Sequence, residues 1–164
     1  MMKKILCIFF ISSIAFSGCE LFTDPCQSLT CLNGGTCIDG ICLCPDYFEG
    51  ANCETEEREK YFGTYSGNTT YSDSQGNSNS YADSKDISSS IEGLAFINLN
   101  GIYASIDSSG SSNFSIPKQG NLNPGATDSS FFSGSGSFNQ NTANWTVSVE
   151  SNGSTVTMSF TGSK

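Results

Sequence analysis

Two stretches of the chain alternate apolar and polar residues on both sides of an Asn-Gly pair. The first, residues 144–160, turns at Asn152-Gly153, and its apolar positions are Trp145, Val147, Val149, Val156, Met158 and Phe160. Asn-Gly is the favoured two-residue turn of a β-hairpin, because both residues readily adopt positive φ. Folding on this turn pairs Val149 with Val156, Val147 with Met158 and Trp145 with Phe160, all on one face. The pattern therefore predicts a β-hairpin.

Residues 94–106 repeat this pattern around Asn100-Gly101. The expected pairs on the apolar face are Leu99–Ile102, Ile97–Ala104 and Ala95–Ile106. Phe96 and Tyr103 would project from the opposite face, so this second hairpin is expected to be partly buried on both sides.

Shorter alternating runs predict further strands at 61–66, 87–92, 113–116 and 131–138. Pro117 is expected to end one strand, because proline cannot donate a ladder hydrogen bond, and "NPG" at 123–125 is expected to form a turn. Residues 72–84 show no alternation and are expected to form a mobile loop. Six to eight short strands predict a mostly β fold, with an antiparallel β-meander over residues 61–164 that closes as a barrel or packs as a sandwich.

Before this β region, six of the eight cysteines lie close together, spaced Cys26-x4-Cys31-x5-Cys37-x4-Cys42-x-Cys44-x8-Cys53. An even number of closely spaced cysteines in an exported chain indicates a disulfide framework, although six cysteines alone permit fifteen pairings. A zinc site is the alternative for clustered cysteines, and the complete lack of His counts against it.

The spacing, together with "NGGTC" at 33–37 and "CLCPDYFEGANC" at 42–53, resembles the EGF-like domain. The resemblance implies an EGF-like domain over residues 24–54 with two small antiparallel hairpins, and the disulfides Cys26–Cys37, Cys31–Cys42 and Cys44–Cys53. About thirty residues cannot bury enough apolar surface to fold alone, so the bridges would carry its stability.

Many EGF-like domains bind calcium. The calcium-binding version has acidic or amide residues four and two positions before the first cysteine, and Glu or Gln immediately before it; here these positions hold Phe22, Asp24 and Pro25. The calcium candidates are therefore Asp24 and, between the third and fourth cysteines, Asp39. They are too few for an ion that takes six or more oxygen ligands, so no cofactor is expected.

The chain opens with a leader of the export type. Lys3 and Lys4 precede an apolar stretch, residues 5–16, which is shorter than the about 20 residues that a transmembrane helix needs. Cys7 lies inside this leader and would be removed with it.

The leader ends in "FSGC", residues 16–19, which resembles the lipobox of bacterial lipoproteins, with Phe16 where that motif usually has Leu. The resemblance implies a signal peptide over residues 1–18, acylation of Cys19 with chains such as palmitate, and a lipidated tether over residues 19–23. The alternative is an ordinary secretory signal followed by a chance cysteine.

From Cys19 onward the chain keeps five basic side chains against all 16 acidic ones, a net charge of −11. Without a basic patch, nucleic acid and anionic lipid headgroups are not expected partners. The expected partners are the lipid bilayer, through acylated Cys19, and an unidentified protein or glycan. Residues 55–60 contain good helix formers and are expected to be a solvated acidic linker, with room for one helical turn, that keeps the two modules apart.

The sequence offers no catalytic constellation: it has no His and no "GxSxG", and the acids of the β region stand singly. We therefore predict that the protein is not an enzyme. Tyr71 and Tyr81 lie on either side of residues 72–80, the most polar part of the segment 72–84, and are the candidates for exposed contacts. Tyr61, Tyr65 and Tyr103 could join them in a sugar-stacking or ligand-lining platform. Core positions are expected for Phe62, Phe96, Phe132, Trp145 and Phe160.

The order of leader, EGF-like domain, acidic linker and "KYFGTY" resembles cell-surface lipoproteins of Gram-negative bacteria. It favours an exported protein, anchored by lipid to the bacterial outer membrane and exposed at the surface, whose β region is an adhesion module that contacts protein or glycan on an EGF-like stalk. "FGTYSG" at 62–67 also resembles the first strand of lipocalin-type barrels, with Tyr65 in place of Trp. One alternative is thus a small periplasmic barrel that carries an apolar ligand, which requires a cavity of some hundreds of cubic ångströms. The other is a structural component of the envelope.

Overall fold

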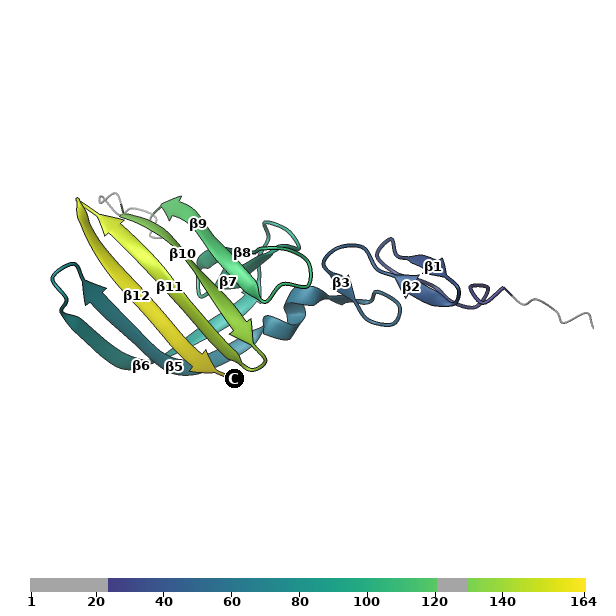
Figure 1. The fold of residues 1–164 in the computed structure, drawn as a ribbon, viewed down its shortest axis with the longest axis horizontal. Helices are drawn as coiled ribbons and strands as arrows, with labels where there is room; N and C mark the ends of the chain where they lie inside the picture. Colours follow the sequence, from purple (N-terminus) through teal and green to yellow (C-terminus); the bar gives the residue numbers. More distant parts are fainter. Residues whose placement is uncertain (1–23, 121–129) are drawn as a thin grey trace, which may run out of the picture.

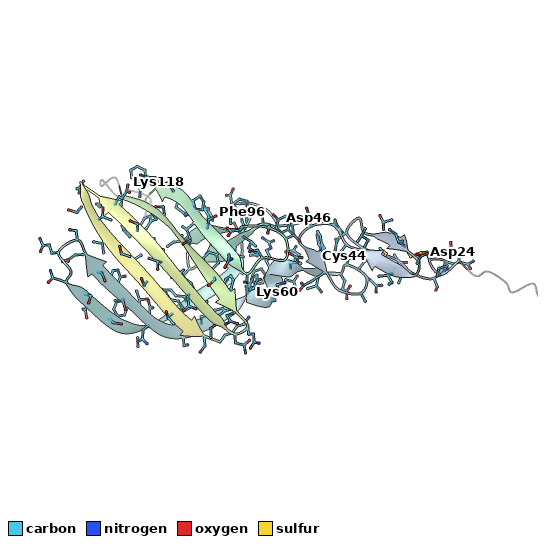
Figure 2. All side chains as sticks on the ribbon, viewed as in Figure 1. Asp24, Cys44, Asp46, Lys60, Phe96 and Lys118 are labelled. Atoms are coloured by element: carbon cyan, nitrogen blue, oxygen red, sulfur yellow. A yellow bond between two sulfur atoms is a disulfide. The ribbon has the colours of Figure 1, made fainter. Side chains whose placement is uncertain are left out.

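The computed structural model describes residues 24–120 and 130–164. They form an elongated molecule with a small cysteine-rich module at one end and a β-barrel at the other (Figure 1). Asp24, the first described residue, lies at the end of the module that is farther from the barrel (Figure 2). The leader, the predicted lipidation site Cys19 with its tether, and the turn expected at 123–125 lie outside the described residues.

The cysteine-rich module has two short hairpins: β1 (Thr36–Ile38) pairs with β2 (Ile41–Leu43), and β3 (Phe48–Glu49) pairs with β4 (Thr55–Glu56). Three disulfides join Cys26 to Cys37, Cys31 to Cys42 and Cys44 to Cys53. This is the pairing that the resemblance to EGF-like domains implies. The fully buried apolar side chains described in the module are Cys42 and Cys53, whereas four large aliphatic side chains are exposed: Leu32, Ile38, Ile41 and Leu43. Disulfides rather than an apolar core therefore hold the module.

The segment 55–60 contains the helical turn that its composition allows, but it is not a fully solvated linker. Thr55 and Glu56 belong to β4, and a 3-10 helix, η1 (Glu57–Tyr61), follows directly. Arg58 and Tyr61 of this helix are buried. The charged composition misled the prediction because the arginine of this segment bonds to backbone carbonyls of the barrel and does not face water.

Eight antiparallel strands form a closed barrel: β5 (Gly63–Asp73), β6 (Ser78–Ser89), β7 (Phe96–Leu99), β8 (Ile102–Ile106), β9 (Asn113–Gly120), β10 (Ser130–Asn139), β11 (Thr142–Ser151) and β12 (Ser154–Ser163). Each strand pairs with the next in sequence, and β12 closes the ring on β5. The predicted mostly β fold is confirmed, and the meander closes as a barrel rather than packing as a sandwich.

Both predicted hairpins have their predicted register. In β11 and β12 the pairs are Val149–Val156, Val147–Met158 and Trp145–Phe160. In β7 and β8 the pairs are Leu99–Ile102 and Ile97–Ala104. Ala95 lies just before β7, and its carbonyl accepts a hydrogen bond from the Ile106 N–H at 2.7 Å. The apolar face of each hairpin points into the barrel. A register error of one residue would turn this face toward water.

Glycines at two places in the sheet allow neighbouring strands to approach closely enough to close the ring. Gly136 is the partner of Trp145, and a Cβ on Gly136 would lie 2.5 Å from the Trp145 Cβ. Gly67 and Gly162 are partners across β5 and β12, and a Cβ on Gly67 would overlap the backbone of β12. Glycine in a strand interior commonly marks such a bend or close approach.

Two local predictions are wrong. Residues 72–84 are mostly not a loop, because β5 ends at Asp73 and β6 begins at Ser78. The Asp73 carboxylate accepts hydrogen bonds from the backbone N–H groups of Gln75 and Asn77, each 2.9 Å long, and so fixes a tight turn. Pro117 lies inside β9, next to a register shift against β10, where a missing N–H is tolerated.

The core aromatic residues differ in part from those predicted. Trp145 and Phe160 are buried, and Phe62 and Phe132 pack partly buried against the core. Phe96 is half-buried outside this cluster. Tyr61 and Tyr65, candidates for a sugar-stacking or ligand-lining platform, are core residues, since their rings stack or tilt against Phe138 inside the barrel.

Candidate functional site: the distal mouth of the barrel

The two ends of the barrel are different. At the proximal end, the connections 90–95 and 107–112 face the cysteine-rich module. At the other end lie the turns 74–77, 100–101 and 152–153; we call this end, with the cavity behind it, the distal mouth. Figure 1 shows the β5–β6 and β11–β12 turns at the end of the molecule opposite the module.

The proximal end is closed by aromatic packing. The Tyr61 and Phe138 rings stack with centroids 4.2 Å apart, and Phe114 lies 5.0 Å from Phe138. The Tyr65 hydroxyl donates to the Tyr61 carbonyl, and the Tyr61 hydroxyl donates to the Ser111 carbonyl. Burial raises the pKa of both tyrosine hydroxyls above its ordinary value. This end has the character of a core, which leaves the distal mouth as the candidate for binding.

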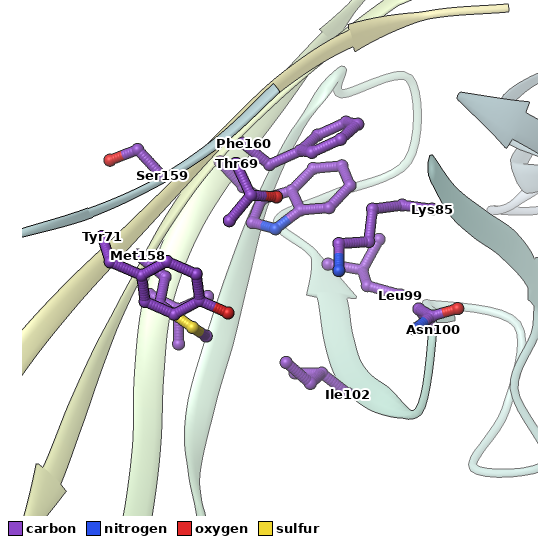
Figure 3. A pocket seen from close by; sticks show the side chains of 11 residues that line it. Thr69, Tyr71, Lys85, Leu99, Asn100, Ile102, Met158, Ser159 and Phe160 are labelled. Atoms are coloured by element: carbon purple, nitrogen blue, oxygen red, sulfur yellow. The ribbon is translucent and has the colours of Figure 1, made fainter. Parts of the chain in front are cut away.

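The distal mouth contains a cavity of about 70 Å³. Tyr71 and Met158 lie on one side of it, and the β7–β8 turn with Leu99, Asn100 and Ile102 lies on the other (Figure 3). The remaining lining residues are Thr69, Lys85, Trp145, Val147, Ser159 and Phe160. Two rows of β-ladder partners build its wall: Trp145–Phe160–Thr69–Tyr81 and Val147–Met158–Tyr71–Asn79.

A hydrogen-bonded cluster of three side chains lies beside this wall. The Asp83 carboxylate accepts from the Lys85 ammonium at 2.8 Å and from the Thr69 hydroxyl at 2.7 Å. It also accepts the Ser84 backbone N–H at 2.8 Å. The hydrogen bonds from Lys85 and Thr69 hold the pKa of Asp83 below its ordinary value. The cluster pairs one positive with one negative side chain, and Asp83 accepts from three donors in all.

Tyr71 and Tyr81, the predicted contact residues, meet at the distal mouth. Their rings stack with centroids 5.6 Å apart and an interplanar angle of 17°, and the Tyr81 hydroxyl donates to the Tyr71 hydroxyl at 2.9 Å. This hydrogen bond raises the pKa of Tyr81 to about 12. Tyr71 lines the cavity, whereas Tyr81 is 43% exposed. The pair thus offers one aromatic face to solvent in a fixed orientation.

Arg58 fixes the opposite end of the barrel to the module. Its Nη1 donates to three barrel carbonyls, those of Ser90 at 3.2 Å, Gly93 at 2.7 Å and Phe96 at 2.7 Å, and its Nε donates to Glu56 at 2.8 Å. A buried guanidinium is stable only when its donors are satisfied in this way. Arg58 thus joins η1 to the β6–β7 connection through hydrogen bonds.

A second set of contacts joins the module to the β8–β9 connection. The Glu57 carboxylate accepts from the Ser109 hydroxyl at 2.9 Å and from the Gly110 N–H at 2.8 Å. The Ser109 hydroxyl in turn accepts the Tyr47 N–H at 3.1 Å. Lys60 of η1 pairs with Glu49 of β3 at 2.9 Å. With contacts to two barrel connections, the module is held in one orientation.

The other predicted site residues do not join the distal mouth. Asp24 accepts the Cys26 N–H at 2.9 Å, and Asp39 lies in the β1–β2 turn with φ of 50°. Within the described ranges, no group of three or more His, Cys, Asp or Glu residues could hold a metal ion. In the same part of the chain, no helix is long and apolar enough to cross a membrane.

Sequence reasoning missed the Thr69–Asp83–Lys85 cluster and the role of Arg58. Asp83 and Lys85 precede the buried Ile87 at two-residue spacing, so they point into the barrel. That spacing was the available signal, and the lack of apolar alternation in 72–84 hid it. Arg58 gave no signal, because its partners are backbone carbonyls more than 30 positions away.

The comparisons with known proteins concern the cysteine-rich module. A cubilin homolog from Caenorhabditis elegans is 46% identical over 55 residues, and mouse lactadherin is 44% identical over 57 residues. These matches cover 30% and 32% of this chain but 1% and 11% of the two relatives. No solved structure matches the chain. The family model of the EGF-like domain matches residues 26–53. Spacing, disulfide pairing and family match agree, so residues 26–53 form an EGF-like domain.

Proposed function

We propose that this protein is a non-enzymatic, membrane-anchored lipoprotein of the bacterial cell surface. Its barrel contacts an extracellular protein or glycan through the distal mouth, and its EGF-like domain is the stalk. Three disulfides in an EGF-like domain are typical of exported, extracellular proteins. The two relatives match less than a third of this chain each, so the role of the barrel is argued from its own geometry.

One observation carries the proposal: Asp24, the first described residue, and the distal mouth lie at opposite ends of a molecule whose two parts are joined by hydrogen bonds. Cys19 precedes Asp24 by five residues, a tether of at most about 18 Å when fully extended. Asp24 lies at the end of the module away from the barrel (Figure 2). The contacts of Arg58 and Glu57 prevent the barrel from folding back along the stalk. An anchored chain would thus present its mouth away from the membrane.

The cavity weakens the alternative of an apolar-ligand carrier. Sites for drug-sized ligands have volumes of about 300–1,000 Å³, whereas this cavity has about 70 Å³. Tyr61, Tyr65, Phe114 and Phe138 fill the proximal interior. A structural envelope component would need no cavity, so this alternative stays a prediction. Binding experiments distinguish it from the proposed contact function.

Two variants of the full chain test the anchor, Cys19→Ser and the matched control Cys7→Ser in the leader. After expression in a Gram-negative host, the wild type and Cys7→Ser should fractionate with the membrane and carry acyl label. Cys19→Ser should do neither. Membrane association and labelling of Cys19→Ser would contradict the lipoprotein proposal.

Protease treatment of intact cells tests the orientation. Loss of residues 61–164 from intact cells is the expected result, since the barrel would face outward. If the barrel is cut only after the outer membrane is opened, it is periplasmic, and the surface-contact half of the proposal is wrong.

A further inference from the structure

The distal mouth combines a small apolar cavity with a polar rim. Trp145, Met158, Phe160, Leu99 and Ile102 form the apolar lining, while the polar groups at its edge come from Thr69, Tyr71, Lys85 and Asn100. Figure 3 shows the Lys85 amine and the Tyr71 hydroxyl directed toward the space between these walls. Ligand sites commonly have this composition, an apolar pocket with a few convergent polar groups.

The size of the cavity limits what can enter it. An apolar cavity of about 150 Å³ binds benzene, and the present cavity of about 70 Å³ is roughly half as large. A branched group of about four non-hydrogen atoms suits this volume, whereas an acyl chain or an indole does not. The ligand therefore inserts a small group and leaves most of its surface at the rim.

The charge of the rim limits the ligand further. Lys85 is neutralised by Asp83 at 2.8 Å, and the chain as a whole has a net charge of −9. An anionic ligand would be repelled by this negative charge, and the Lys85 ammonium is already paired. A cationic ligand would find Asp83 already accepting from three donors. The rim thus favours a neutral group that can both donate and accept hydrogen bonds, as an amide does.

The edge of β6 argues against an extended peptide as the ligand. Its residues before Ile87 have no ladder partner on the β7 side among the described residues, but two of the backbone groups there are occupied. The Ser84 N–H is bonded to Asp83, and the Asp86 carbonyl accepts the Asn100 N–H at 2.9 Å. Inward-pointing charges such as Asp83 and Lys85 are a common means of preventing strand addition.

The Tyr71–Tyr81 pair supplies the remaining feature, a rigid aromatic face beside the cavity. Stacking and the hydroxyl–hydroxyl hydrogen bond hold both rings in place before any ligand arrives, which reduces the entropic cost of binding. The exposed face of Tyr81 is suited to the C–H face of a sugar ring, because both surfaces are apolar and flat.

We propose that the distal mouth binds a neutral glycan that carries N-acetyl groups. The acetamido methyl enters the cavity against Trp145, Met158 and Phe160, and its amide group meets the polar rim at Lys85 and Asn100. The sugar ring stacks on Tyr81. This inference rests on the proposed contact function and names the partner of the same mouth.

The test uses Trp145, the single Trp of the chain, as a reporter inside the cavity. The full chain is titrated with a β1,4-linked trisaccharide of N-acetylglucosamine and, separately, with the glucose trisaccharide of the same linkage. The acetylated sugar should shift the Trp145 emission. The glucose trisaccharide should bind about tenfold more weakly or worse, since it lacks the group that fills the cavity.

Two variants and a control locate the site. Tyr81→Ala should weaken binding of the acetylated trisaccharide about tenfold, through loss of the stacking face. Met158→Phe should weaken it by filling the cavity beside Tyr71, its ladder partner, while both tyrosine rings are retained. Tyr103→Ala removes a tyrosine from the outer surface of β8, 36% exposed, and should bind as the wild type does.

Three outcomes would overturn the inference: no emission change with either sugar, equal affinity for the two sugars, or equal loss of binding in Tyr103→Ala. None of them bears on the acylation of Cys19 or on protease access in intact cells. A protein partner that protects Tyr81 in place of a sugar would also overturn it while leaving the surface-contact proposal intact.

Discussion

The EGF-like domain and the barrel solve the same problem, holding a β structure together, by different means. In the EGF-like domain the buried apolar side chains are cystines, and Ile38, Ile41 and Leu43 face water. In the barrel, by contrast, aromatic and aliphatic side chains from all eight strands pack into one cluster, and residues 61–164 contain no cysteine. A small domain lacks the volume for a core, so covalent bonds replace it.

The difference also separates the roles of the two regions. A module held by disulfides keeps its shape whatever its surface residues are, which suits a spacer. The barrel can leave part of its interior unfilled at the distal mouth, because the proximal aromatic residues supply the core. The hydrogen bonds at the junction then fix the orientation of one region relative to the other.

Reduction of the disulfides is the strongest way to break this comparison. Each bridge closes a loop with a sequence separation of 9 or 11 and contributes about 3 kcal/mol. Losing all three should unfold the EGF-like domain completely, while the barrel stays folded. Hydrogen exchange measured by mass spectrometry, with and without reductant, should show loss of protection in residues 26–53 only. Loss of protection throughout the barrel would mean that the two regions are one cooperative unit.

The reverse experiment removes a core side chain of the barrel. Phe114 is 1% exposed and packs against Phe138 and Trp145, so Phe114→Ala should lower the free energy of unfolding of the barrel by about 4 kcal/mol. Urea unfolding followed by Trp145 fluorescence measures it. The control is Phe131→Ala at a site that is 41% exposed, where a loss of about 1 kcal/mol or less is expected. Similar losses in the two variants would show that the core does not carry the stability.

The junction is the third place to test the comparison. Arg58→Met should cost about 3 kcal/mol, because it leaves the Ser90, Gly93 and Phe96 carbonyls without their shared donor. It should also loosen the orientation, which small-angle X-ray scattering would record as a broader distribution of interatomic distances. Lys60→Met removes an exposed ion pair with Glu49 and should cost less than about 1 kcal/mol. An unchanged scattering profile in Arg58→Met would mean that the Glu57 contacts are sufficient.

The sequence was informative wherever apolar residues alternated around a turn signal. Trp145–Phe160 and Leu99–Ile102 were predicted to the residue, because the Asn-Gly turn and the period of two fix both register and face. The cysteine spacing carried the disulfide pairing through its resemblance to the EGF-like domain. In each case the information was local, within about twenty residues.

The candidate site was predicted only in part. Tyr71 and Tyr81 were singled out for flanking a supposed loop, and they lie together because β5 and β6 continue through that segment. Arg58 and the Thr69–Asp83–Lys85 cluster depend on contacts between strands and connections that local polarity cannot indicate. Closure of β12 on β5 is likewise a contact between residues far apart in the sequence. The sequence alone therefore leaves the choice between barrel and sandwich open.

The smallest expected effect sharpens the contrast between the filled barrel interior and its open mouth. The hydrogen bond to Tyr71 raises the pKa of Tyr81 from 10.0 to about 12. Because the folded-state value is the higher one, this bond stabilises the fold below pH 10, and its contribution is lost as the pH rises through about 12. Tyr71→Phe should return the pKa of Tyr81 toward its ordinary value, and tyrosinate absorbance during an alkaline titration should lose its step near pH 12. Tyr103→Phe should retain that step. If Tyr71→Phe retains it as well, the late titration belongs to the buried Tyr61 and Tyr65, and the tyrosine pair at the mouth is not held by its hydroxyls.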